Sequence, residues 1–278
     1  MKKTESITTS TDTRFAETLG GSEYEDLLIA LEYYDDFQAE TGAALRRYVQ
    51  KHCQHLGSIR VLEAGPGTGI TTLELLKADP RVHVTSVDNE PKMLKAVEDR
   101  FTNLAEQKDR VEFVLADILQ YLESCDDDSL DAFASVFTLH NFTPAFRSSV
   151  ISLIAQKLKQ GGAFINGDKY AQRDDLHQID FASEIRNYGK FEVAAKAADE
   201  AGDTSRAAHL RQVHAEWVHH ADEDEVNKIT VDEQHAMLEE LGFVEIEWMK
   251  RFDLVTTVKA IKRSRPETVR IETLSDRP

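Results

Sequence analysis

The stretch Val61-Leu62-Glu63-Ala64-Gly65-Pro66-Gly67-Thr68-Gly69, written VLEAGPGTG, decides how the rest of the chain is interpreted. An apolar run ends in glycines at positions 65, 67 and 69, and a carboxylate stands two residues ahead of the first glycine. Glycine tolerates positive φ and lets a ligand approach the main chain closely. A strand followed by such a loop is typical of the first βα unit of an open parallel sheet, where ligands bind beyond the carboxyl ends of the strands.

Strand and helix patterns alternate downstream of this loop. Two helices between about 24 and 55, with a break near 34–36, precede the first strand at 60–64. The predicted strands that follow are 82–87, 111–115, 130–137 and 162–166, and the predicted helices are 71–77, 91–104, 118–124 and 144–158. Such alternation requires βαβ crossovers and therefore a mostly parallel sheet with helices on both faces.

The alternation of strand and helix patterns stops after residue 170. Residues 171–222 are polar, poor in strand patterns and helical in their apolar spacing, which predicts a helical insertion. A last helix at 231–241 ends at Gly242, and two strands at 244–251 and 254–261 are expected to pair antiparallel at the sheet edge. The predicted fold class is α/β, a doubly wound, mostly parallel seven-stranded sheet with an antiparallel C-terminal hairpin, N-terminal helices and a helical insertion over the active site.

Composition restricts the partners. The formal net charge of −17 repels phosphate backbones and anionic lipid, so we expect no nucleic acid and no membrane partner. Cys53 and Cys125 lie far apart without CxxC spacing, which favours a reducing, cytoplasmic location over a disulfide framework. We find no signal peptide and no apolar run of membrane-spanning length. A homodimer is left open.

The acidic residues around the glycine loop indicate the ligand. A dinucleotide fingerprint GxGxxG would need glycine at 70, where Ile70 stands. Asp88 closes the second strand, 23 residues after Gly65, where a carboxylate can accept both ribose hydroxyls. Asp117 follows the third strand, placed to meet an exocyclic amine beside Ile118. Glu63 repels a pyrophosphate and attracts a cation. Together these features describe a ligand with a ribose, an adenine and a positive charge, but no phosphate.

At this point the chain resembles the class I (Rossmann-like) S-adenosylmethionine-dependent methyltransferases. The segment 63–69 looks like their motif I, Val87-Asp88 like their acidic second-strand end, and 116–118 like their adenine contact; 133–143 and 158–163 look like the motifs at the fourth and fifth strands. The resemblance implies S-adenosyl-L-methionine as the cofactor. The implied cofactor-binding residues are Glu63, Gly65, Gly67, Gly69, Asp88, Asn89, Met93, Asp117, Ile118 and Phe137. Asp117 alone could equally cap the next helix.

The resemblance also divides the chain into segments. We expect a flexible tail at 1–23, a cofactor-binding domain made of 24–170 and 223–262, a helical lid at 171–222 and a C-terminal tail at 263–278. The expected reaction is in-line displacement of a methyl group onto O, N or C of a small-molecule acceptor, for which alignment and exclusion of water matter most.

The acceptor is expected past the fourth strand. His140 is our candidate catalytic residue, as a base or an orienting donor, although His140-Asn141 could simply cap the next helix. Phe142-Thr143 replaces the prolines of the Asp/Asn-Pro-Pro-Tyr tetrapeptide, which argues against nucleobase and protein-glutamine acceptors. The candidate substrate contacts are Tyr34, Asn141, Lys169, Tyr170, His214 and Trp217. Packing of the N-terminal helices explains Tyr34 equally well.

His209, His214, His219 and His220 lack the spacing of a metal site, so we predict no metal.

Two other interpretations of the function stay open. Residues 252–259 and the pair Asp168-Lys169 loosely resemble carboxy-S-adenosylmethionine synthases, but we cannot place the arginine that those enzymes need. A non-catalytic sensor or partner subunit that binds S-adenosylmethionine would carry the same cofactor residues.

Overall fold

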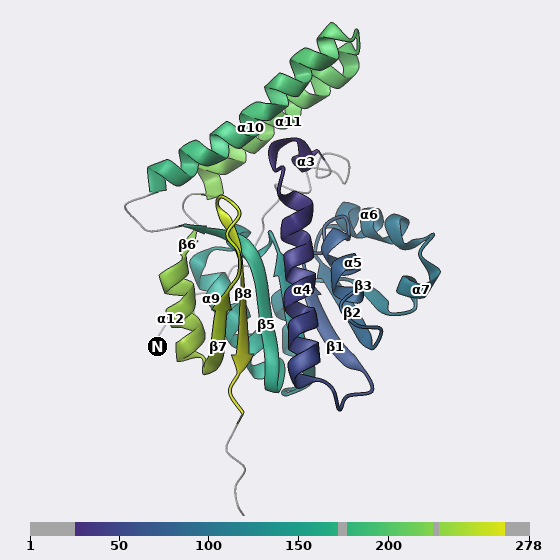
Figure 1. Ribbon diagram of the computed structural model, residues 1–278, viewed down its shortest axis with the longest axis vertical. Helices are drawn as coiled ribbons and strands as arrows, with labels where there is room; N and C mark the ends of the chain where they lie inside the picture. Colours follow the sequence, from purple (N-terminus) through teal and green to yellow (C-terminus); the bar gives the residue numbers. More distant parts are fainter. Residues whose placement is uncertain (1–25, 172–176, 225–227, 265–278) are drawn as a thin grey trace, which may run out of the picture.

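A computed structural model describes residues 26–171, 177–224 and 228–264. The predicted tail at 1–23 and nearly all of the tail at 263–278 lie outside the described residues. In the described part, helices and strands form three layers, with a central sheet between two layers of helices (Figure 1).

The main path of the sheet has the strand order β3-β2-β1-β4-β5-β8-β7. Its first five strands are parallel and the last two run antiparallel to their neighbours, as the sequence predicted. The two-residue strand β6 pairs with the end of β5, off this path. The bounds are β1 Ile59–Ala64, β2 Val82–Asp88, β3 Val111–Leu115, β4 Leu130–Val136, β5 Leu158–Ala171, β6 Ile229–Thr230, β7 Phe243–Trp248 and β8 Val255–Lys262.

Two apolar cores fix the helices to the sheet. The core on one face includes Leu45 of α4, Leu75 of α5 and Val97 of α6. The core on the other face includes Leu122 of α8 and Ile154 of α9, and α12 packs beside them. The inner strands read as nearly continuous apolar runs because both of their faces are covered. The bounds are α4 Tyr34–His52, α5 Ile70–Leu76, α6 Pro91–Phe101, α7 Ala105–Lys108, α8 Ile118–Ser124, α9 Pro144–Lys157 and α12 Val231–Glu240.

The strand order reverses between β1 and β4. The chain leaves β1 for α5 on one face of the sheet, and it leaves β4 through the 3-10 turn Leu139–Asn141 for α9 on the other face. Because the two loops turn away from each other, a crevice opens at the carboxyl ends of these strands. This arrangement places the glycine loop where the sequence predicted it.

The helical insertion is a hairpin of two long helices, α10 (His177–Glu200) and α11 (Thr204–Asp224). It lies above the carboxyl edge of the sheet beside α3 (Leu27–Ala30), and its far end extends away from the body (Figure 1). Tyr188, Phe191 and Trp217 pack in one cluster with Tyr34 and Phe37. The hairpin is therefore joined to the N-terminal helices, and α11 extends two residues beyond the predicted boundary at 222.

Several predicted bounds differ from the observed ones by three residues or more. The N-terminal helices break at residues 31–33 instead of 34–36. The fifth strand runs from Leu158 to Ala171 instead of 162–166. Its last part contains Asp168 and Lys169, and buried charges do not look like a strand core in a sequence. The structure compensates both charges with partners, described below, so the strand continues.

Candidate active site

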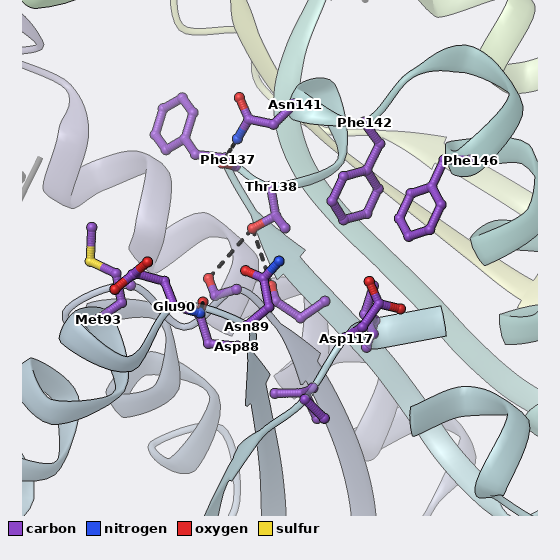
Figure 2. Close-up of a pocket in the computed structure, with 16 residues that line it drawn as sticks. Asp88, Asn89, Glu90, Met93, Asp117, Phe137, Thr138, Asn141, Phe142 and Phe146 are labelled. Carbon is purple, nitrogen blue, oxygen red and sulfur yellow. Dashed lines mark hydrogen bonds between the residues drawn. The ribbon is translucent and has the colours of Figure 1, made fainter. Parts of the chain in front are cut away.

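One open cavity with about 750 Å³ of empty space lies over the carboxyl ends of β1, β2, β3 and β4. It contains eight of the ten predicted cofactor residues, all except Glu63 and Gly69. Asp88, Asn89 and Met93 lie on one side and Asp117 on the other, with Phe142 and Phe146 near Asp117 (Figure 2). The lining residues are Ala64, Gly65, Gly67, Val87, Asp88, Asn89, Glu90, Met93, Ala116, Asp117, Ile118, Phe137, Thr138, Asn141, Phe142 and Phe146.

The glycine loop bounds the cavity with bare main chain. Gly65 and Gly67 line it, with φ values of 65° and 53°, a conformation that favours glycine. Gly69 has φ 84° and does not line the cavity. A Cβ on Gly69 would stand 2.5 Å from Cγ2 of Val97. The structure therefore gives Gly69 a packing reason, the close approach of α6, in addition to its backbone conformation.

Asp88 presents a carboxylate at the end of β2. Its Oδ1 accepts the backbone N–H of Glu90 at 2.9 Å. Burial raises the pKa of Asp88 to about 6, although backbone hydrogen bonds from Glu90, Asn89 and Gly67 oppose this rise. A partly desolvated carboxylate in a cleft is a strong acceptor for ligand hydroxyls.

Asp117 serves two purposes. Its Oδ1 caps α8 by accepting the N–H groups of Leu119 at 2.9 Å and Gln120 at 3.2 Å. The residue also lines the cavity, next to Ile118. The helix cap and the predicted adenine contact are therefore compatible, since the cap holds the carboxylate at the cavity wall.

Glu63 lies fully buried next to the glycine loop and does not reach the cavity. Its Oε2 accepts hydrogen bonds from Thr72 Oγ1 at 2.7 Å and Ser86 Oγ at 2.6 Å. Its Oε1 is buried without a hydrogen-bond partner among the described residues. Burial raises the Glu63 pKa to about 7, and the neighbouring Asp88 charge contributes to the rise. The loop thus rests on an uncompensated carboxyl, which a bound cation would stabilise.

The end of β4 has a strained backbone. Phe137 has φ 53°, which is rare for a bulky side chain. Its N–H donates to the carbonyl of Gly167 at 2.9 Å, and its own carbonyl accepts Nδ2 of Asn141 at 3.3 Å. Its ring stacks on Tyr34 at 5.9 Å and contacts Phe37 edge-on at 5.0 Å. Strain of this kind clusters at functional sites.

His140 is buried behind this segment and is not among the lining residues. Its Nδ1 lies 2.5 Å from Oδ1 of Asp168, and its backbone N–H donates to Oδ2 of the same carboxylate at 3.1 Å. Asn166 also donates to Asp168, at 3.3 Å. The sequence singled out His140 but gave no sign of this pairing, which depends on the long β5.

Lys169 and Tyr170, predicted to contact substrate, are held in the interior. Lys169 Nζ donates to Glu184 of α10, and Lys228 Nζ donates to the other oxygen of Glu184 at 3.0 Å. Tyr170 is buried and accepts Nδ2 of Asn166 at 2.6 Å. The contact of Lys169 with Glu184 ties β5 to the hairpin, whereas Asn166 and Tyr170 both belong to β5. The structure does not bring Lys169 or Tyr170 to the cavity.

The other predicted substrate residues are spread over three places. Asn141 lines the main cavity, whereas Tyr34 lines a smaller one of about 250 Å³ on the same glycine loop, with Gln38 and Thr71. Trp217 is buried in the hairpin and stacks on Tyr188 at 5.7 Å. His214 lies on α11, outside both cavities.

The histidines of α11 show no metal cluster in the part of the chain that the structure describes. His209 instead approaches Oδ2 of Asp26 at 2.8 Å. The side chain of His220 lies outside the described residues. Among the same residues, no helix combines the length and apolar character that crossing a membrane requires.

Sequence reasoning missed several lining residues. Thr138, Phe142 and Phe146 belong to the segment after β4, and Glu90 follows Asp88 as the N-cap of α6. Position relative to strand ends could have indicated Glu90. The two phenylalanines could not have been found, because an aromatic residue at helical spacing is more often part of a core.

The comparisons with known proteins agree with this geometry. Residues 61–162 match a family model described as "Methyltransferase domain". A malonyl-[acyl-carrier protein] O-methyltransferase from Bacillus cereus is 29% identical over 84 residues, which are 30% of this chain. The chain matches only about a third, 31%, of that relative's length.

Solved structures share the fold at low identity. YcgJ from Bacillus subtilis has a TM-score of 0.53 at 15% identity, covering 80% of this chain and 99% of that one. Magnesium protoporphyrin IX methyltransferase from Synechocystis, solved with bound S-adenosylmethionine, has a TM-score of 0.50 at 14% identity, covering 82% and 79%. At these identities the likeness concerns the fold.

Residues 61–162 therefore match a methyltransferase domain, and the solved structures share the fold that the sequence resemblance implied. One of these solved structures holds bound S-adenosylmethionine, the cofactor that the sequence resemblance implied. The residues present fit this cofactor, because the buried Oε1 of Glu63 and the carboxylates of Asp88 and Asp117 favour a cationic nucleoside.

Proposed function

We propose that the protein transfers a methyl group from S-adenosylmethionine to O, N or C of a small-molecule acceptor. The observation that carries the proposal is the single cavity in which eight residues predicted from four separate strand ends come together. Such convergence of acidic and apolar groups at the switch point of a parallel sheet is the expected form of a nucleoside site.

Different residues would bind different parts of the cofactor. S-adenosylmethionine, when bound, supplies an electrophilic methyl group on a sulfonium centre. Asp88 would accept the ribose hydroxyls, and Asp117 with Ile118 would hold the adenine. Because Gly65 and Gly67 have no side chains, the methionine part of the cofactor could approach the main chain of the glycine loop closely.

The acceptor would enter beside Asn141 and Phe142. These residues lie in the part of the cavity wall that follows β4 (Figure 2). Phe137, in the same wall, also belongs to the aromatic cluster of the N-terminal helices. Alignment and exclusion of water would contribute most to the rate, because the displacement itself needs no protein nucleophile.

His140 is our candidate base only for an acceptor that must lose a proton and that reaches past the lining residues, because His140 is buried and does not line the cavity. Asp168, at 2.5 Å from Nδ1, would fix the tautomer so that Nε2 carries the basic lone pair. His140→Gln should lower the rate with such an acceptor and leave the affinity for the cofactor unchanged. An unchanged rate would remove His140 from the mechanism.

A two-part experiment tests the proposal. Calorimetry with S-adenosylmethionine and S-adenosylhomocysteine measures occupancy of the cavity, and a methyl-labelled cofactor incubated with fractionated cell extract measures turnover. Binding together with a labelled small-molecule product supports methyl transfer. Binding without any labelled product would favour a sensor, and failure to bind either compound would refute the cofactor assignment.

A further inference from the structure

The crevice between β1 and β4 has a side-chain bridge at its base. The parallel register of these strands ends at the pair Ala64↔Ser135. Beyond this pair one chain enters the glycine loop and the other turns at Phe137, so the backbone ladder no longer connects them. Thr138, the next residue, lines the cavity at this point.

The hydroxyl of Thr138 spans the gap. Its Oγ1 lies 3.1 Å from the carbonyl oxygen of Ala64 and 3.4 Å from that of Gly65, both on the β1 side (Figure 2). It also lies 3.1 Å from the carbonyl of Val136 on its own strand. A hydroxyl has one proton to donate, so this proton is shared among carbonyls from both sides of the crevice.

Thr138 and Gly65 also fit each other sterically. A Cβ on Gly65 would stand 2.4 Å from Oγ1 and 2.7 Å from Cγ2 of Thr138, distances that real Cβ atoms do not show. The threonine side chain therefore fills the space that the glycine leaves. The position of the first glycine of the loop and the position of Thr138 determine each other.

The sheet imposes the position of Thr138. Phe137, directly before it, is held at φ 53° by its N–H bond to Gly167 and by the Asn141 bond to its carbonyl. A strained residue fixed on both sides is a rigid support for the next one. The Thr138 hydroxyl thus connects the glycine loop, where the methyl donor would bind, to the segment 137–142, where the acceptor would bind.

We propose that Thr138 is a positioning residue, whose hydroxyl sets the separation of the glycine loop from the acceptor segment. This inference rests on the proposed function and assigns a residue to it that acts through the backbone of Ala64 and Gly65. Removing the hydroxyl leaves the shape of the site unchanged but frees the loop, so the cofactor would bind to a less ordered backbone.

Thr138→Val tests the hydroxyl, because valine keeps the volume and branching of threonine. Loss of one such bond should raise the Kd for S-adenosylmethionine and for S-adenosylhomocysteine about threefold to tenfold. Hydrogen exchange at the amide of Gly65, which donates to Val87 at 2.9 Å, should become faster. Thr138→Ser, which retains the hydroxyl, should stay within about twofold of the wild-type Kd.

Thr256→Val is the matched control. Thr256 is buried on β8, its hydroxyl donates to the carbonyl of Met249 at 3.1 Å, and it is not among the residues that line the cavity. The Thr256→Val variant should have a lower free energy of unfolding in urea and an unchanged Kd for S-adenosylmethionine. Should the valine variant fail to fold, Thr138→Ala takes its place, with the same expected loss of affinity.

The outcomes separate the two claims. A wild-type Kd for Thr138→Val, or an equal loss for Thr138→Ser, would overturn the positioning role while the cofactor site stands. Loss of affinity in Thr256→Val as well would show that general loosening of the sheet is responsible and would also overturn it. No binding by the wild-type protein would refute the proposed function and this inference together.

Discussion

Glu63→Gln should change how folding stability depends on pH. The Glu63 pKa is about 7 in the folded protein against 4.5 for an ordinary glutamate. Between these values the folded chain keeps a proton that the unfolded chain has lost. Stability therefore falls as pH rises through this window and levels off above about pH 7. Glutamine carries no charge, so the variant lacks this loss.

The magnitude follows from the two pKa values. One pKa unit corresponds to about 1.4 kcal/mol. Integration from about pH 5.5 to about pH 8.5 gives a loss of about 2 kcal/mol for the wild type that the variant does not share. Asp88 titrates in both proteins, and its coupling to Glu63 is part of the difference between them. The difference in unfolding free energy, variant minus wild type, should therefore rise by about 2 kcal/mol over this range.

Urea unfolding at three pH values measures this difference. Glu98→Gln, the same substitution at an exposed position of α6, is the control and should give the same curve as the wild type. Parallel pH dependences for Glu63→Gln and the wild type would refute the reasoning, because they would show that Glu63 does not titrate as a buried carboxyl.

Four further predictions concern the site and its support. Asp88→Asn should weaken S-adenosylmethionine binding at least about tenfold in calorimetry, because a charged acceptor is lost; an unchanged Kd would contradict the ribose assignment. The wild-type Kd should be about fourfold weaker near pH 5.5 than near pH 8, because protonation of Asp88, with its pKa of about 6, competes with the ligand, and Asp88→Asn should remove that dependence. Lys169→Met should cost about 1.5–3 kcal/mol in urea unfolding, because Glu184 loses one of its two buried cationic partners and keeps Lys228; unchanged stability would contradict a structural role for this pair. Gly242→Ala, at φ 83° after α12, should cost about 1 kcal/mol without affecting cofactor affinity, and a neutral result would argue against the left-handed cap.

Much of the fold followed from local patterns. The alternation of short apolar runs with amphipathic helices predicted the order of elements, and the parallel sheet with its antiparallel C-terminal hairpin is confirmed. The end of β5 could not be predicted, because Asp168 and Lys169 look like loop residues until Glu184 and His140 are brought to them by tertiary contacts.

The cavity was predictable to a similar degree. Residues that follow strand ends, such as Asp88 and Asp117, were found because parallel topology places all of these ends at one edge. Tyr170 was expected to contact substrate because it follows the predicted fifth strand, and Trp217 because it lies in the predicted lid, yet both are buried in packing clusters. Position along the chain cannot tell a buried aromatic from a lining one. Thr138 was missed because its role depends on the splaying of β1 from β4.

The hairpin of α10 and α11 leaves and rejoins the sheet at neighbouring points, since Tyr170 pairs with Ile229 and Ala171 with Thr230. Because its two ends are adjacent, the insertion can change in length or be exchanged for another one without altering the strand order of the sheet. The hairpin could therefore be exchanged while the sheet and the cavity over it are kept, provided that the replacement again packs against Tyr34, Phe37 and Phe137.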